Sequence, residues 1–165
     1  MTKPIISIVG KSASGKTTLL TKIVRELTRQ GYKIGTVKHD AHKFEIDYPG
    51  KDSYRHFHSG SEATLIISPE KLAFIRRLSK PLKLKRVLNY FPPEIDLIIT
   101  EGFKRENYPK IEVVRSATGS VPICKPKGDN LIALTSDIKI KNYRIPQFRL
   151  GATKKIVHFI KEKFL

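Results

Sequence analysis

The stretch GKSASGKTT, Gly10–Thr18, decides the fold of this chain. It matches the pattern G-x-x-x-x-G-K-[ST] and stands between the apolar run IISIV (5–9) and a segment with apolar residues at helical spacing (17–30). In a loop of this kind the glycines let successive backbone N–H groups converge on one point, and the following helix adds its positive end. The stretch therefore predicts a site for the phosphates of a nucleotide.

The side chains of this loop and its surroundings indicate how the phosphates and a metal ion would be held. Lys16 is a movable cation for the β- and γ-phosphates, and the Thr17 hydroxyl is a small, hard oxygen suited to Mg²⁺. Mg²⁺ also needs an acid at the end of a neighbouring strand. Glu101 follows the run DLIIT directly, and Asp40 follows KIGTVKH as either a metal contact or an ordinary loop acid. Asp96 begins its strand, so it is expected at the opposite edge of the sheet.

The expected phosphate contacts are Gly10, Lys11, Ser12, Ala13, Ser14, Gly15, Lys16, Thr17 and Thr18. The expected metal contacts are Thr17, Asp40 and Glu101, and the expected catalytic groups are Lys16, Asp40 and Glu101.

Short apolar runs alternate with amphipathic segments, which indicates an α/β fold with a mainly parallel sheet and helices on both faces, as in P-loop NTPases. Strands are expected at 5–9, 33–38, 62–68, 96–100, 110–115 and 131–134. Helices are expected at 17–30, from Asp52 or Ser53 to about 59, at 69–78, at 82–90 and at about 152–164. No repeat or linker stands out, so the 165 residues are expected to form a single domain, 1–165.

The composition limits the class of protein and the kinds of partner. The net charge is +17, from 32 Lys and Arg against 15 Asp and Glu, which indicates either an anionic partner or a lysine-rich solvated surface. The basic segment 71–86 has apolar residues at helical spacing, and aromatic and basic residues are not interleaved, so nucleic acid is not favoured. The lone Cys124 excludes an intramolecular disulfide. The N-terminus resembles neither a signal peptide nor a membrane span, so a cytoplasmic location without membrane contact is expected.

A second cluster of chemistry-bearing residues lies in KHDAHKFEIDYPGKDSYRHF, residues 38–57. His39, His42 and His56 stand here, with His58 directly after, among several cations and acids, but no cysteine is near and the spacing is not that of a zinc site. Lys51 and Arg55 are one helical turn apart, which suits a cationic rim for a second anionic group. An ordinary solvated polar loop is the alternative.

Five stretches in this order resemble the MobB family of molybdopterin-guanine dinucleotide biosynthesis adaptor proteins: GKSASGKTT, TVKHDAH, DYPGKDSYRHFHSGS, DLIITEGFK and PKIEVVR. The likeness covers about residues 4–137, and D-x-P-G-K-D-S is its most specific part. It implies a P-loop fold related to dethiobiotin synthetase and the signal-recognition-type GTPases, with bound GTP and Mg²⁺ and weak GTP hydrolysis at most. It also implies a homodimer that partners the guanylyltransferase MobA, with molybdopterin or a molybdoenzyme as a further ligand or partner.

The resemblance also implies roles for residues outside the phosphate loop. Lys38, His39, Asp40 and His42 would line the switch-like side of the nucleotide. Asp47, Lys51, Asp52 and Arg55 would face a ligand or the other subunit, and Glu101, Gly102 and Lys104 would close the site.

The sequence lacks the Asn/Thr-Lys-x-Asp motif with which common GTPases read guanine. Asp137, in the Thr-Ser-Asp that follows the run LIAL, is a candidate for that role, and a helix cap or strand-end turn is the alternative.

The preferred interpretation is a GTP-binding accessory protein of molybdenum-cofactor biosynthesis, whose own enzymatic turnover the sequence leaves open. A small-molecule kinase is an alternative, with Arg76, Arg77 or Arg86 on a lid and Asp40 or Asp52 as a base. A nucleic-acid-binding NTPase is the other, motivated only by the positive charge.

Overall fold

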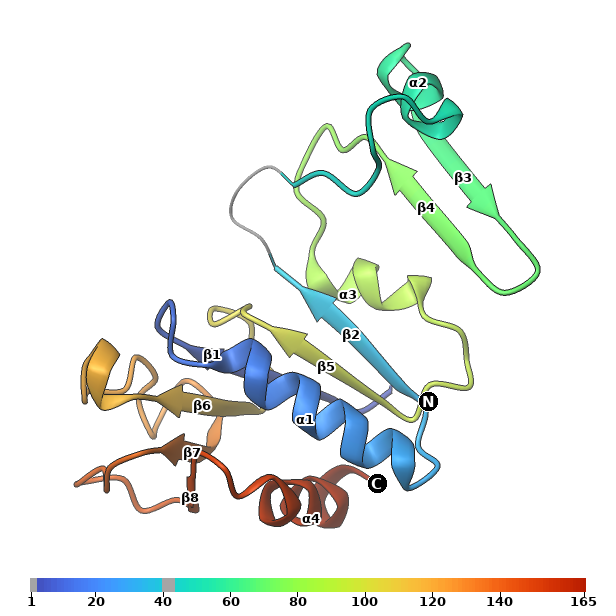
Figure 1. Ribbon diagram of the computed structural model, residues 1–165. Coiled ribbons are helices and arrows are strands. Elements are labelled where there is room, and N and C mark those ends of the chain that lie inside the picture. The colour runs from blue at the N-terminus through green and yellow to red at the C-terminus, as the bar shows by residue number, and fades with distance from the viewer. Residues whose placement is uncertain (1–2, 40–43) are drawn as a thin grey trace. The chain divides into compact units, whose positions relative to one another are not determined.

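The computed structural model describes residues 3–39 and 44–165, and the chain forms two compact units (Figure 1). The first unit combines Met1–His39 with Phe91–Leu165, and the second is Asp40–Tyr90. Asp40 and His42, which the sequence places in the site, lie outside the described residues.

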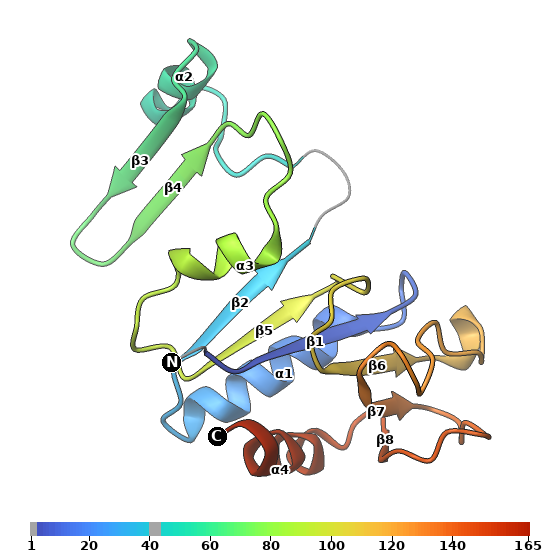
Figure 2. The same ribbon diagram turned by 180° about the vertical axis from the view of Figure 1, so that it is seen from behind.

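The first unit is built on a six-stranded sheet in which every neighbouring pair of strands is parallel, in the order β2-β5-β1-β6-β7-β8. The strands are β1 (Ile5–Gly10), β2 (Ile34–Lys38), β5 (Leu97–Glu101), β6 (Lys110–Val114), β7 (Leu131–Ser136) and β8 (Gln147–Arg149). The expected α/β fold with a mainly parallel sheet is confirmed, and only β8 was not expected. Because the strands are parallel, all their carboxyl ends lie at one edge of the sheet (Figures 1 and 2).

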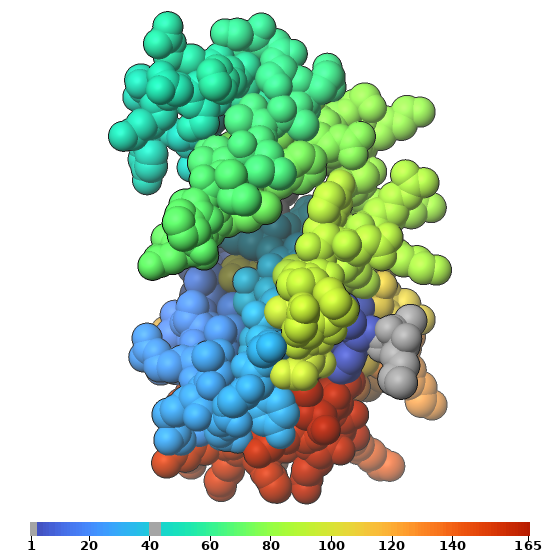
Figure 3. Space-filling model, turned by 90° about the vertical axis from the view of Figure 1, so that its right-hand side faces the viewer, coloured from blue at the N-terminus to red at the C-terminus, as the bar shows by residue number. Residues whose placement is uncertain are grey.

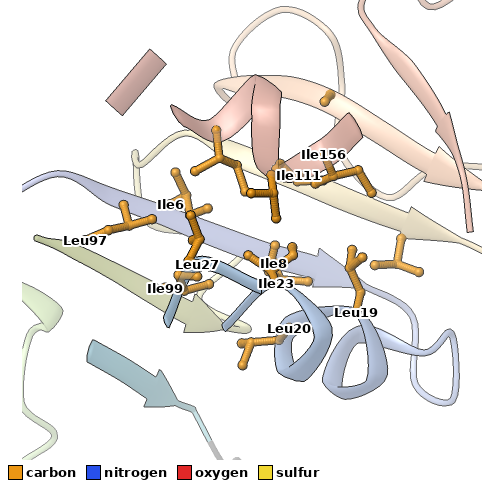
Figure 4. Close-up of a cluster of buried hydrophobic side chains, with 14 residues drawn as sticks. Ile6, Ile8, Leu19, Leu20, Ile23, Leu27, Leu97, Ile99, Ile111 and Ile156 are labelled. Carbon is orange, nitrogen blue, oxygen red and sulfur yellow. The ribbon is translucent and has the colours of Figure 1, made fainter. Parts of the chain in front are cut away.

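Helices α1 (Lys16–Arg29) and α4 (Thr153–Phe164) cover one face of this sheet. Figure 4 shows Leu20, Ile23 and Leu27 of α1 on the same side of the sheet as Ile8, and Ile156 of α4 belongs to the same buried cluster. In Figure 3 the blue atoms of α1 lie against the red atoms of α4. Each such buried Leu or Ile stabilises the fold by about 1.5–3 kcal/mol, so this cluster fixes the start of α1 relative to β1.

The opposite face carries a second buried cluster, to which chain connections contribute as well as strands. Val9 and Leu134 pack there with Cys124 and Ile140, which come from the segments after β6 and β7. The buried Glu112 anchors the first of these segments, because its carboxylate accepts hydrogen bonds from the backbone N–H groups of Ile123 (2.6 Å) and Cys124 (3.0 Å). Burial raises the pKa of Glu112 above its ordinary value, against the effect of these two hydrogen bonds.

The second unit contains α2 (Asp52–His58), the antiparallel pair β3 (Ala63–Ile67) and β4 (Leu72–Arg76), and the short helices α3 (Leu84–Val87) and η1 (Leu88–Tyr90). The expected short helix near 52–59 and the expected helix at 82–90 are both found, the latter as α3 followed by η1.

The helix expected at 69–78 is wrong, because Leu72–Arg76 is the second strand of a hairpin. The residues Ser68–Lys71 make its turn: the N–H of Ser68 donates to the carbonyl of Lys71 at 2.8 Å, and the N–H of Lys71 donates to the Ser68 hydroxyl at 3.0 Å. Pro69 therefore belongs to a tight turn and not to the first turn of a helix. The expected strand at 62–68 exists, but it pairs only within this hairpin and does not join the parallel sheet.

Candidate phosphate and metal site

The loop between β1 and α1 has a backbone that only small residues can follow. Gly10 and Gly15 have φ angles of 146° and 97°, in the region that favours glycine. A Cβ atom on Gly10 would lie 2.4 Å from the carbonyl oxygen of Val113 and 2.8 Å from the Ser14 hydroxyl oxygen. The loop is thus packed tightly on the end of β6, which leaves its other side to a ligand.

The polar groups of the loop fit a phosphate. The Lys16 ammonium reaches across the loop and donates to the carbonyl of Lys11 at 2.7 Å. Helix α1 begins at Lys16, its N-cap residue Gly15 provides no side-chain cap, and its first turn has no acidic residue, so the described side chains leave its first N–H groups available. The fully buried Ser14 hydroxyl also has no hydrogen-bond partner in the described part of the chain. These donors and this ammonium form the polar lining that an anion requires.

Thr17 and Glu101, the two described residues expected to hold Mg²⁺, are in direct contact. The Thr17 hydroxyl lies 2.9 Å from both Oε1 and Oε2 of Glu101. Residues 84 positions apart in the chain meet because β1 and β5 are adjacent parallel strands and both end at this edge. A hydroxyl and a carboxylate are the hard oxygen ligands that Mg²⁺ prefers, with phosphate oxygens and water completing its shell. The described residues contain no group of three or more His, Cys, Asp or Glu suited to a metal ion.

Lys38 and His39 flank this pair from β2. Lys38 is opposite Glu101 in the parallel register, and the N–H of His39 donates to the Glu101 carbonyl at 3.0 Å. Gly102 then turns with a φ of 95°, and a Cβ atom there would lie 3.3 Å from Cβ of His39. The His39 and Phe103 rings meet edge to face, with centroids 4.8 Å apart. Lys38, His39, Glu101 and Gly102 are therefore brought together, and Lys104 follows two residues later as an exposed side chain.

Asp137 has a structural partner. Its Oδ1 accepts the N–H of Ser116 at 2.9 Å and its Oδ2 accepts the Ser116 hydroxyl at 2.8 Å. These two hydrogen bonds, the backbone one first, hold the pKa of Asp137 below its ordinary value. Asp137 thus accepts two hydrogen bonds from the first residue of the short helix η2 (Ser116–Thr118), an arrangement that fits the cap or turn role, while its role as a reader of guanine stays a prediction.

Asp47, Lys51, Asp52 and Arg55 all belong to the second unit. Lys51 immediately precedes α2, and its carbonyl accepts the N–H of Arg55 at 3.0 Å. Arg55 Nη1 lies 3.8 Å from Asp52 Oδ1, an exposed pair that reduces the local excess of positive charge. Asp47 accepts the N–H of Tyr48 at 2.9 Å.

Arg77, a candidate for a kinase lid, supports the hairpin instead. Its Nη2 donates to the carbonyl of Phe57 at 2.5 Å and its Nε to that of Ser61 at 3.1 Å, while its guanidinium lies 4.4 Å from the Phe57 ring centroid. These contacts tie β4 to α2 and leave the side chain little freedom to clamp a transferred phosphoryl group.

Sequence reasoning missed Arg115, the residue that follows β6. Its Nη2 would lie 3.5 Å from a Cβ atom placed on Gly15, which puts the guanidinium beside the phosphate loop. The available signal was its position at the end of KIEVVR, the carboxyl end of a predicted strand.

Comparisons with known proteins find one family and several similar structures. The profile of the family described as molybdopterin guanine dinucleotide synthesis protein B, MobB, matches residues 5–137. The chain is 38% identical over 109 residues to the molybdopterin-guanine dinucleotide biosynthesis adapter protein of Haemophilus influenzae, covering 66% of this chain and 61% of that protein. It is 32% identical over 140 residues to the adapter protein of the same name from Escherichia coli, covering 83% of this chain and 80% of that protein. The chain thus spans less than two thirds of the length of the Haemophilus relative.

The folds of several solved structures match the fold of this chain over nearly its whole length. A crystal structure of molybdopterin-guanine biosynthesis protein B has a TM-score of 0.74 and 32% identity, covering 96% of this chain and 98% of that one. The crystal structure of Bacillus subtilis MobB has the same TM-score at 26% identity, covering 98% of both chains. Separately, none of the described helices combines the length and apolar content needed to cross a membrane.

Proposed function

Because the chain belongs to the MobB family of molybdopterin guanine dinucleotide synthesis proteins, we propose that it is a GTP-binding accessory protein of molybdenum-cofactor biosynthesis that assists a MobA-type guanylyltransferase. The observation that carries this proposal is the contact between Thr17 and Glu101 at the mouth of the phosphate loop. Thr17 and Glu101 would hold Mg²⁺ beside the loop, and the ion would supply positive charge against the phosphates.

Each residue of the site then has a definite task. The backbone N–H groups of the loop and the Lys16 ammonium bind the phosphates, and Thr17 and Glu101 orient the metal ion. Bound Mg²⁺ would neutralise part of the charge on the phosphates. Lys16 and Glu101 would support only slow hydrolysis of GTP. They would bind and orient the phosphates and the metal ion, whereas a fast GTPase also positions the water that attacks the γ-phosphate.

Isothermal titration of the purified protein with GTP and ATP, with and without Mg²⁺, tests this proposal. We expect GTP to bind in Mg²⁺ and Lys16→Ala to weaken binding at least about tenfold, because the removed ammonium makes charge-assisted hydrogen bonds. Lys33→Ala, which removes an exposed lysine at the opposite end of β2, is the matched control. A wild-type protein that binds no guanine nucleotide would refute the proposal.

The MobA partnership is tested by a pull-down with purified MobA-type guanylyltransferase, with and without GTP. If the wild-type protein retains the partner and GTP changes the amount retained, the accessory role is supported. No retention under either condition would refute the partnership, although nucleotide binding could persist.

The segment 44–55 is proposed as the rim that meets molybdopterin or a molybdoenzyme. Exposed cations at Lys51 and Arg55 support this proposal, since molybdopterin carries an anionic phosphate. Lys51→Ala and Arg55→Ala should leave the GTP titration unchanged and weaken binding of molybdopterin. Equal loss of both affinities would mean that these residues only support the fold. The cytoplasmic location stays a prediction.

A homodimer is proposed to form through the hairpin β3–β4. Leu65 faces Phe74 and Ile67 faces Leu72 across the two strands, so these four side chains share one face. They are 44–72% exposed, and a two-stranded sheet with such a face is marginal alone in water. A two-fold related copy presents the same apolar surface and could cover it.

Sedimentation equilibrium of the full chain tests the dimer. We expect the wild-type protein to sediment as a dimer and Leu65→Lys to shift it towards monomer. Glu70→Lys, which adds the same side chain in the hairpin turn, should not. A monomeric wild-type protein would refute this proposal and would leave the apolar face to a different partner.

A further inference from the structure

We propose that Arg115 binds the α-phosphate of the nucleotide, as a residue of the phosphate site that the loop motif does not include. This inference rests on the proposed function, because it takes the loop after β1 to hold a guanine nucleotide. Three features support it: the place of Arg115 in the sheet, the restraint on its backbone and the absence of a hydrogen-bond or ion-pair partner for its guanidinium among the described residues.

Arg115 lies at the same edge of the sheet as the phosphate loop. Strand β6 is the direct neighbour of β1, with Gly10 paired to Val113, so the residue that follows β6 comes level with the phosphate loop. Figures 1 and 2 both show the turn after β6 (orange) at the edge where the loop after β1 (blue) lies. The 3.5 Å separation between Nη2 of Arg115 and a Cβ placed on Gly15 confirms that the guanidinium lies against this loop.

The backbone at Arg115 and directly after it is held by hydrogen bonds. Its carbonyl accepts the N–H of Thr118 at 2.9 Å and the Thr118 hydroxyl at 3.1 Å. The next residue, Ser116, is held twice by the carboxylate of Asp137. Asp137 is therefore a positioning residue in this proposal, because it fixes the turn from which Arg115 projects.

The guanidinium has donors to offer. Over residues 3–39 and 44–165, no hydrogen bond or ion pair engages the side chain of Arg115, and the residue is exposed. A planar guanidinium that bonds to no acceptor in these two ranges, beside the proposed phosphate loop, is suited to two parallel hydrogen bonds to phosphate oxygens.

The position of the metal pair identifies the phosphate concerned. Thr17 follows the loop after β1 and Glu101 is the last residue of β5, so this pair would hold a metal ion on the β5 side of the loop, where it would offset charge on the terminal phosphates. Strand β6 lies on the other side of β1 from β5. A side chain from the end of β6 is therefore on the side of the loop away from the metal pair, which favours the α-phosphate, the phosphate furthest from such a metal ion, as its ligand.

Titration of the full-length protein with GTP, GDP and GMP in Mg²⁺ tests this assignment. We expect Arg115→Ala to weaken binding of all three nucleotides by a similar factor of about tenfold to a hundredfold, since each contains the α-phosphate. Arg115→Lys keeps the charge without the planar fork and should recover part of this loss. Arg25→Ala is the control. It removes an exposed arginine that lies about 15 Å from Gly15 along the axis of α1, and it should change none of the affinities.

The outcomes separate this inference from the proposed function. Wild-type binding of GTP that Arg115→Ala leaves unchanged would overturn the inference alone. Loss of GTP affinity with unchanged GDP and GMP affinities would also overturn it, because Arg115 would then contact the γ-phosphate. A wild-type protein that binds none of the three nucleotides would overturn both. Thermal unfolding of each variant shows whether a lost affinity reflects a lost fold.

Discussion

The hydroxyl of Thr17 lies 2.9 Å from each carboxylate oxygen of Glu101, although the two residues are 84 positions apart. The contact joins the first turn of α1 to the last residue of β5. Helix α1 is fixed by its buried face and β5 by its pairing with β1, so neither partner needs to move to make this contact. The contact between the two residues proposed to hold Mg²⁺ is thus preformed, which would reduce the ordering cost of binding.

The pair predicts a specific change in the metal dependence of binding. Thr17→Val preserves the shape of the side chain and removes its oxygen, so the gain in GTP affinity on adding Mg²⁺ should fall by about tenfold. Binding in the presence of EDTA should be little changed. Thr17→Ser keeps the hydroxyl and should preserve the wild-type response. An unaltered Mg²⁺ response in Thr17→Val would show that this hydroxyl does not contact the metal.

Gly10 predicts a second effect, on folding. Alanine at this position combines an unfavourable φ of 146° with a Cβ atom 2.4 Å from the Val113 carbonyl, so we expect Gly10→Ala to lower the free energy of unfolding by more than about 3 kcal/mol. Gly31→Ala is the control, because Gly31 also has a positive φ, 92°, but no atom lies within 4 Å of its Cβ position. That change should cost about 1 kcal/mol. Urea unfolding measures both, and equal effects would contradict the tight packing of the loop.

The elements predicted correctly from the sequence are those whose residue pattern fits only one kind of secondary structure. Ile5–Gly10 and Leu97–Glu101 are apolar runs too short for a helix and flanked by turn residues, which fits only buried parallel strands. The phosphate loop is specified by its own glycines and lysine. The sequence pattern puts Glu101 at the end of an apolar strand, and the parallel pairing of β5 with β1 then brings it beside the loop.

The errors arise where a pattern has two explanations. In Leu72–Arg76 the apolar residues fit a helix as well as a strand, and only the turn formed by Ser68–Lys71 decides between them. Other features were not predicted because they depend on tertiary contacts, which a local sequence pattern does not reveal. Lys110 is almost fully buried because its ammonium donates to the carbonyls of Glu106, Tyr108 and Asp129, and Arg115 approaches Gly15 only through the pairing of β6 with β1.

Asp137 predicts a result that separates its two possible roles. If it caps η2 and positions Arg115, Asp137→Ala should weaken GTP and ATP binding by similar factors and leave the preference between them unchanged. If it reads guanine, the preference itself should disappear. Competition between GTP and ATP on the wild-type and variant proteins measures this ratio directly.

The same residue predicts a pH dependence of stability. Its folded-state pKa is held below the ordinary value of 3.8 by the hydrogen bonds from Ser116, so the carboxylate stabilises the fold above that pH. This contribution is lost as the pH falls through the lowered folded-state pKa. The melting temperature of Asp137→Ala should therefore lie below that of the wild type at pH 7, and the gap should close in strong acid. Ser116→Ala, which removes one of the two donors, should give a smaller gap, and a gap that widens in acid would contradict the assignment.

Cys124 predicts slow thiol chemistry in the folded protein. Burial, with the nearby Glu112 carboxylate as a second cause, raises the pKa of this thiol to about 12, so its thiolate fraction at pH 8 should fall about a thousandfold relative to an exposed thiol. Because the chain has one cysteine, the reaction with a thiol reagent such as 5,5′-dithiobis(2-nitrobenzoic acid) reports on this site alone. Native protein should react at least a thousandfold more slowly than protein in concentrated urea, and Cys124→Ser supplies the background. Since the folded-state pKa is raised, stability should also fall as the pH rises above about 9, where only the unfolded chain ionises. Equal reaction rates in the folded and unfolded protein would show that the segment covering Cys124 opens readily.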